Sequence, residues 1–258
     1  DGHPIRIKTT AGFWPLIAGI PSSEDAPELI NHLKNDDEFA RRHLFPSLSA
    51  DEDGFKPNGA YWRGGVWGNE NYMIIAGLKR YGEYEFATTT AWNHITNMEK
   101  IFTGYFPDTS LIDEKYWANC NATVWELYSP ENDQPGTRWD TYNLCRPNYI
   151  PTSGFGPVAM LIEDVLGFRV NGPDDQLTWR LWLLNKHGIR NLKFGNNLVT
   201  LWCEKRETKE SPVDIKGLTS SPFFLTIILE QDTITIKQPR GRINISFKME
   251  DIKKINKD

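Results

Sequence analysis

The sequence predicts a mainly α fold that is followed by a small antiparallel β-sandwich. Apolar residues recur at helical spacing up to about residue 170, and they alternate with polar residues from about residue 177 onward. Long stretches rich in Gly, Pro, Asn and aromatic residues separate the helical patterns. We therefore expect a helical domain over residues 1–172, a β-sandwich over 173–250 and a charged tail over 251–258.

Four helices are predicted in the first domain. One begins with Ser22 as N-cap, early acidic residues and Pro27 in the first turn. The other three cover residues 66–81, 83–105 and 156–166. A glycine directly follows the helix 66–81, and another directly follows the helix 156–166. Helices paired through short connections and separated by long ones are typical of stacked helix hairpins.

Five strands are predicted in the second domain from their period-two alternation. They cover residues 177–183, 198–203, 223–229, 233–236 and 242–247. Five short strands with turns between them favour an antiparallel sandwich.

Composition excludes several classes of function. The 258 residues carry a net charge of −5, whereas nucleic-acid binders usually present a basic face. No apolar run is long enough to cross a membrane, so no membrane partner is expected. The three cysteines form no CxxC pair, and no metal or other cofactor is expected.

Aromatic residues concentrate in four segments of the helical domain, beside Gly or Pro. Ring faces pack well in cores, but they also stack on the apolar face of a pyranose. Loops held by helix hairpins are common places for such binding residues. The four segments are 12–19, 61–72, 125–132 and 146–157.

Glu126 is the strongest candidate for chemistry because it lies between Trp125 and Tyr128. A carboxylate packed among aromatic rings is desolvated, which makes it a stronger base. Glycoside hydrolysis uses two carboxyl groups, and Glu126 could supply either of them. The structural alternative is that Glu126 caps a helix or pairs with an arginine such as Arg138.

Arg63 lies in a Trp-Arg-Gly-Gly turn with Trp62, and the glycines permit close approach of a ligand to the backbone. This arrangement suits an arginine that binds substrate. It equally suits a structural arginine that bonds loop carbonyl groups.

The order of the four segments resembles the trehalase-like clan of (α/α)6-barrel glycoside hydrolases, notably family 63 glucosidases and mannosylglycerate hydrolase-like proteins. The segment 13–19 is similar to the aromatic-Pro-Leu-x-Ala-Gly loop of that family, and 61–67 to its Tyr-Trp-Arg-Gly signature. The segment 126–130 resembles the Glu-x-Tyr-x-Pro stretch that holds the catalytic base, and 154–163 the last barrel helix. The resemblance covers about residues 11–170 and implies part of an (α/α)6 toroid.

The resemblance implies that Glu126 is the general base of an inverting α-glycosidase of α-glucosidase type, without a cofactor. It places six side chains around the scissile bond: Phe13, Trp14, Trp62, Arg63, Trp67 and Tyr128. The general acid of the family is an aspartate upstream of the segment 13–19, and residues 1–10 offer only the terminal Asp1. We therefore expect a C-terminal portion of a barrel that lacks its acid and shows no hydrolysis alone.

The expected partner is an oligosaccharide or glycoside. Half a barrel would expose apolar helix faces, so a homo-oligomer or a missing N-terminal portion is expected to cover them. A periplasmic or secreted location fits such an enzyme. Three alternatives stay open: a non-catalytic carbohydrate-binding protein, a rhamnosidase-like hydrolase, and a purely structural helical domain.

Overall fold

The computed structural model describes residues 6–230 and 232–248, so the expected tail at 251–258 and Asp1 lie outside the described residues. The chain divides into two compact units, residues 1–161 and 162–258. No helix among the described residues is long and apolar enough to span a membrane.

The predicted mainly α class is wrong. Helices account for 31% of the chain and strands for 25%. The first unit is less helical than expected because residues 35–60 and 105–153 form mostly irregular loops, in which backbone and side-chain hydrogen bonds replace helical ones. The structure therefore does not present the expected segment of a helical toroid.

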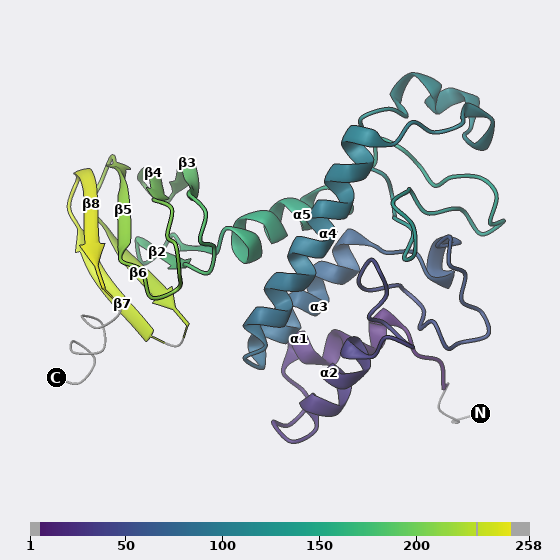
Figure 1. Cartoon of the computed structure of the whole chain (residues 1–258), viewed down its shortest axis with the longest axis horizontal. Helices are drawn as coiled ribbons and strands as arrows, with labels where there is room; N and C mark the ends of the chain where they lie inside the picture. Colours follow the sequence, from purple (N-terminus) through teal and green to yellow (C-terminus); the bar gives the residue numbers. More distant parts are fainter. Residues whose placement is uncertain (1–5, 231, 249–258) are drawn as a thin grey trace. The chain divides into compact units, whose positions relative to one another are not determined.

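The first unit is built on two long helices, α3 (Gly68–Arg80) and α4 (Tyr84–Gly104), which pack against each other. Both agree with the predicted ranges. The short helix α1 (Trp14–Ala18) packs on α3, and α2 (Ala26–Lys34) follows it in the chain. Figure 1 shows the long connections 35–67 and 105–153 gathered on the same side of these helices. The other helical elements of the described residues are short: η1 (Thr10–Phe13), η2 (Tyr61–Arg63), η3 (Thr109–Leu111), η4 (Glu114–Asn119), α5 (Phe155–Ala159) and η5 (Met160–Val165), the last of which extends past the boundary at residue 161.

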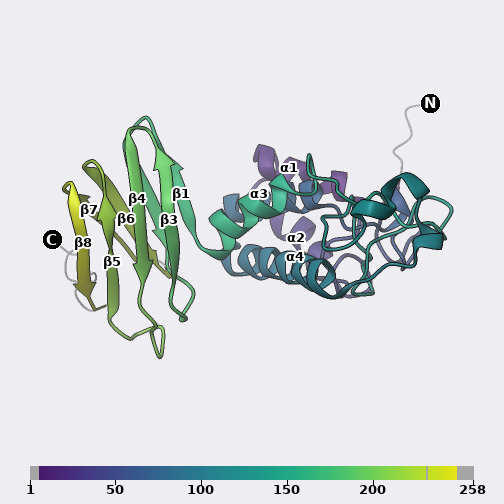
Figure 2. The same cartoon turned by 90° about the horizontal axis from the view of Figure 1, so that it is seen from above.

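The second unit contains two four-stranded sheets, in the orders β1-β2-β6-β7 and β3-β4-β5-β8. A sandwich is therefore present, and the axes of its strands are roughly aligned (Figure 2). The prediction of a wholly antiparallel sandwich is wrong, because β2 pairs with β6 in parallel. The strands are β1 (Phe168–Asn171), β2 (Gln176–Arg180), β3 (His187–Phe194), β4 (Asn197–Cys203), β5 (Val213–Thr219), β6 (Phe223–Leu229), β7 (Asp232–Gln238) and β8 (Gly241–Phe247).

The core of the second unit is made from the inward-facing positions of both sheets. Trp179 lies at its centre, stacked on Phe168 with 4.6 Å between the ring centroids. Its indole N–H donates to the carbonyl oxygen of Leu166, so the one polar atom of the ring is satisfied.

Candidate functional site

Glu126 lies in an extended segment of the first unit whose backbone is fixed on both sides. Its N–H donates to the carbonyl oxygen of Arg146 at 2.9 Å, and its own carbonyl oxygen accepts from the Ser153 hydroxyl. Two residues later, Tyr128 exchanges both backbone hydrogen bonds with Val66. The segment is not helical, so Glu126 does not cap a helix.

The Glu126 side chain is buried, and the residue is only 3% exposed. The Tyr61 hydroxyl donates to Oε1 at 3.3 Å. Arg146 contacts Oε2 through its backbone N–H at 3.5 Å and through Nε at 3.9 Å. Arg138, the expected structural partner, instead pairs with Asp113 at 2.7 Å. The carboxylate is therefore held between a phenol and an exposed arginine.

Tyr61 joins this carboxylate to a group of aromatic rings. Its ring contacts those of Trp62, Trp67 and Trp139 at centroid distances of 5.9, 5.0 and 5.1 Å. Burial, followed by the negative charge of Glu126, raises the pKa of Tyr61, so the hydroxyl stays a donor to the carboxylate.

Two of the rings that contact Tyr61 are accessible to solvent. Trp62 is 41% exposed and Trp139 is 54% exposed. Trp62 stacks on the buried Trp67 at 4.2 Å with an interplanar angle of 11°, which fixes its orientation. An ordered, half-exposed indole next to a carboxylate is the kind of surface on which a pyranose ring stacks.

The glycines of the Trp-Arg-Gly-Gly turn serve the backbone rather than a ligand. Gly64 has φ +135°, a region that L side chains rarely adopt. A Cβ on Gly65 would lie 2.5 Å from the carbonyl oxygen of Tyr61 and 2.7 Å from Leu127. The two glycines therefore let the turn close onto the segment that carries Glu126.

Arg63 uses its guanidinium group within this loop, where Nε donates to the carbonyl oxygen of Gly54 at 3.0 Å. Its own carbonyl oxygen accepts from the N–H of Lys56 at 2.7 Å. The structure places Arg63 as a link between the turn and the loop 54–56, which is the structural role left open above.

We expect Arg63→Ala to lower the free energy of unfolding by about 1 kcal/mol, because it removes one hydrogen bond from a partly buried charged group. Denaturant titration of wild type and variant measures this change. Arg42→Ala is a matched control, since Arg42 is an exposed arginine paired with Asp133 at the surface. Equal stability of wild type and Arg63→Ala would contradict the structural role.

Three of the predicted contact residues are buried in this structure. Phe13 packs edge-on against Phe39 with 4.9 Å between the ring centroids. Tyr128 accepts a hydrogen bond from the Trp125 N–H, and burial raises the pKa of its hydroxyl. Trp67 lies beneath Trp62, and its indole nitrogen has no partner among the described residues. In this structure these three side chains are buried, and their contact with a substrate stays a prediction.

The start of α3 brings the remaining parts together. A Cβ on Gly68, the first residue of α3, would lie 3.4 Å from the Cα of Ser153, whose hydroxyl bonds the Glu126 carbonyl. Two residues further along α3, Glu70 accepts from the indole of Trp14 at 3.2 Å. Glu126, the aromatic group and Trp14 thus lie near the N-terminal end of one helix.

Sequence reasoning missed several residues of this site: Tyr61, Glu70, Trp139, Arg146 and Ser153. Tyr61 and Glu70 lie in a segment that had been singled out, as do Arg146 and Ser153. The sequence pattern therefore indicated the segments that contain these four residues. Nothing in the local pattern indicates which side chain of a segment meets Glu126.

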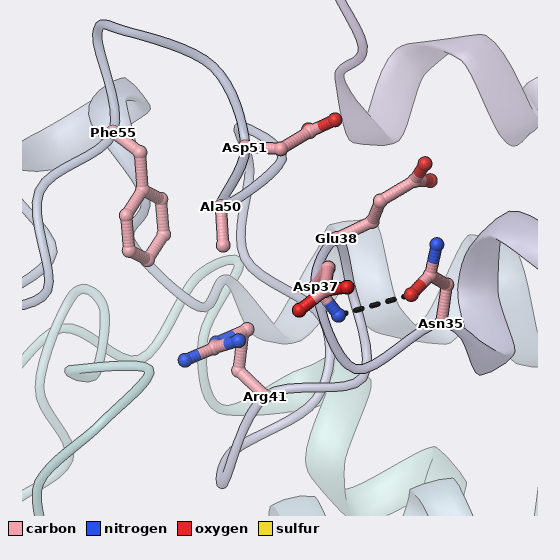
Figure 3. Close-up of a pocket in the computed structure, with 7 residues that line it drawn as sticks. All are labelled: Asn35, Asp37, Glu38, Arg41, Ala50, Asp51 and Phe55. Carbon is pink, nitrogen blue, oxygen red and sulfur yellow. Dashed lines mark hydrogen bonds between the residues drawn. The ribbon is translucent and has the colours of Figure 1, made fainter.

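A hollow of the first unit, with a volume of about 650 Å³, lies elsewhere. Figure 3 shows its lining, where the Asp37 N–H donates to the side-chain oxygen of Asn35 at 3.0 Å. Glu38 in its wall is already paired with Lys8 at 2.8 Å and with His32 at 2.6 Å. The lining residues are Asn35, Asp37, Glu38, Arg41, Ala50, Asp51 and Phe55. None of the predicted site residues lines it, and Glu38 and Asp51 are engaged in ion pairs.

Comparison with known proteins identifies a family for this chain. The model of the mannosylglycerate hydrolase MGH1-like glycoside hydrolase domain matches residues 1–143. An uncharacterized protein of Borreliella burgdorferi is 27% identical over 245 residues, which are 93% of this chain and 48% of that protein. The mannosylglycerate hydrolase of Thermus thermophilus is 39% identical over 99 residues, which are 38% of this chain and 23% of that enzyme.

A solved structure of a family 63 mannosylglycerate hydrolase from Thermus thermophilus, in complex with Tris, covers 62% of this chain and 30% of its own. It is 27% identical with a TM-score of 0.43, which is too low to establish a common fold. The chain spans about half the length of the Borreliella relative and less of the others. Because the family model matches more than half of the residues, the chain belongs to the mannosylglycerate hydrolase MGH1-like glycoside hydrolase family.

Proposed function

We propose that this chain carries the base half of the active site of an inverting α-glycosidase, with Glu126 as the general base. The observation that carries the proposal is a buried, oriented carboxylate that Tyr61 connects to the exposed indoles of Trp62 and Trp139. Membership of a glycoside hydrolase family supports the reaction class.

The geometry suits a base that takes a proton from water. The Tyr61 hydroxyl contacts Oε1 and the Arg146 side chain lies 3.9 Å from Oε2, so the two groups hold the carboxylate in one orientation. In an inverting hydrolysis the base activates a water molecule on one face of the sugar while an acid protonates the leaving oxygen on the other. The proposed acid is an aspartate of the whole protein that lies upstream of these residues.

The proposed substrate is an α-linked hexoside of the α-glucoside type. Three relatives are named mannosylglycerate hydrolases, so an α-mannoside linked to a small hydroxy acid is the second substrate to test. The stacking surface of Trp62 and Trp139 fits the apolar face of either hexose.

The stereochemical outcome tests the mechanism. The whole protein that contains these residues is mixed with an α-glucoside or with mannosylglycerate, and the products are followed by proton NMR. An inverting enzyme releases the β-anomer of the sugar first, and mutarotation then produces the α-anomer. Appearance of the α-anomer first would contradict inversion, although the protein would still be a glycoside hydrolase.

A non-catalytic carbohydrate-binding protein is the second candidate. It is favoured by the burial of the Glu126 side chain, which leaves the carboxylate little access to water in this structure. Sugar binding without turnover by the whole protein would favour this candidate over the hydrolase.

A further inference from the structure

Glu70 is a buried carboxylate that the proposed mechanism does not use. It is the third residue of α3 and is 6% exposed. Oε2 accepts a hydrogen bond from Nε1 of Trp14 at 3.2 Å. Within the described residues, no cation pairs with Glu70. Charged side chains are rarely buried without such compensation, so this position requires an explanation.

Part of the compensation comes from the helix. The N-terminal end of a helix carries a partial positive charge, which stabilises an acidic side chain in the first turn. The indole N–H adds one hydrogen bond, but a carboxylate has room for about four. The structure gives Oε1 no hydrogen-bond donor among the described residues. Glu70 is thus held in place through Oε2, while Oε1 remains able to accept a hydrogen bond.

The neighbouring groups indicate what that oxygen could bind. Trp14 is 45% exposed, so its ring offers an open face while its N–H is fixed by Glu70. An open indole face with a fixed carboxylate beside it matches a pyranose, whose ring presents an apolar face and whose hydroxyls donate.

We propose that Trp14 and Glu70 form a hexose subsite at the N-terminal end of α3, in which the sugar stacks on Trp14 and donates a hydroxyl to Oε1 of Glu70. The subsite rests on the proposed function, because it assumes that the ligand is a glycoside. Glu70 has two roles in it: it fixes the indole through Oε2 and contacts the sugar through Oε1. A sugar that lacks the donating hydroxyl would lose this hydrogen bond to the carboxylate and would bind less tightly.

The test is a sugar titration of the 258-residue chain labelled with ¹⁵N at the tryptophan indoles. The probes are methyl α-D-glucopyranoside and methyl α-D-mannopyranoside. The Trp14 signal is assigned by its loss in Trp14→Phe. We expect the Trp14 indole signal to shift as at least one sugar is added, and Glu70→Leu to weaken that binding about ten-fold or more.

Two further variants separate contact from positioning. Glu70→Gln keeps the size of the side chain and guards against misfolding of Glu70→Leu. Trp14→Phe removes the indole N–H, so any effect of Glu70→Gln in that background must come from contact with the sugar. Because the Trp14 signal is absent there, the affinity in all variants is measured by isothermal titration calorimetry with the same two sugars. We expect Glu70→Gln to weaken binding about three-fold or more in both backgrounds. No additional effect in the Trp14→Phe background would overturn the sugar contact.

The same spectra separate this inference from the proposed function. If the signals of Trp62 or Trp139 shift while that of Trp14 does not, the sugar binds beside Glu126 only, and the subsite is overturned. If no tryptophan signal responds to either sugar, the proposed function of this chain fails together with the subsite.

Discussion

Replacement of Glu126 by glutamine is expected to lower the turnover number of the whole protein about 10²- to 10⁴-fold, the usual contribution of a positioned general base. Glutamine preserves the size of the side chain and the acceptor for the Tyr61 hydroxyl, so the loop should keep its conformation. An amide has no usable basicity, and the attacking water would then lose its proton acceptor. Initial rates with an α-glucoside and with mannosylglycerate measure the effect.

The expected loss is confined to turnover. KM should change little, because the stacking surface of Trp62 and Trp139 is untouched. Glu131→Gln is the matched control: Glu131 lies further along the same loop and pairs with Arg41 at 2.6 Å. A Glu126→Gln enzyme with turnover within about ten-fold of wild type would rule out Glu126 as the base.

The helices with a strong apolar period were predictable from the sequence. The ranges 66–81 and 83–105 correspond to α3 and α4, because their apolar stripes and the glycine between them are local signals. The irregular segments were not predictable in the same way. Residues 120–145 form much of the buried core around Glu126, including Trp125 and Leu127, without any regular element. Their structure depends on hydrogen bonds to distant residues, as in the pairing of Tyr128 with Val66.

The same distinction applies to the sandwich. Five strands follow from alternation, but β1, β3 and β5 were missed. β1 has only four residues, and β3 has an irregular register between Ile189 and Leu192 that interrupts its period. β5 alternates clearly, with Val213, Ile215 and Thr219 buried, so its omission had no physical cause. The parallel pairing of β2 with β6 is a property of the topology, which local alternation does not contain.

Acidification is expected to destabilise the first unit through His94, a residue of α4 that is completely enclosed. Its ring packs edge-on against Tyr128 with 5.9 Å between the centroids, and neither ring nitrogen has a partner among the described residues. Burial, and to a lesser degree the nearby His43, lowers the pKa of His94 from its ordinary 6.5 to about 4. Among the described residues, no acidic group offsets this effect.

The direction of the pH effect follows from the lowered pKa. Between pH 6.5 and about 4 the unfolded chain protonates His94 while the folded chain does not, so the unfolded state binds more protons. Stability is therefore complete above pH 6.5 and falls as the pH decreases through this window. A difference of this size corresponds to about 3 kcal/mol, a large share of the stability of a typical domain.

Denaturant unfolding of wild type and His94→Leu at about pH 7.5 and about pH 4.5 tests this expectation. Leucine cannot be protonated. Between the higher and the lower pH, the free energy of unfolding of the variant should therefore decrease by about 2 to 3 kcal/mol less than that of wild type. This difference does not depend on the stability of the variant at the higher pH. His32→Gln is the control, because His32 is partly exposed and paired with Glu38. This variant still contains His94, so its free energy of unfolding should show the same His94-dependent decrease on acidification as wild type. His43 and His187, whose pKa values burial also lowers, contribute to wild type and His94→Leu alike and cancel in the comparison. Equal losses in wild type and His94→Leu would show that His94 finds a hydrogen-bonding partner when protonated, and that its enclosure does not limit acid stability.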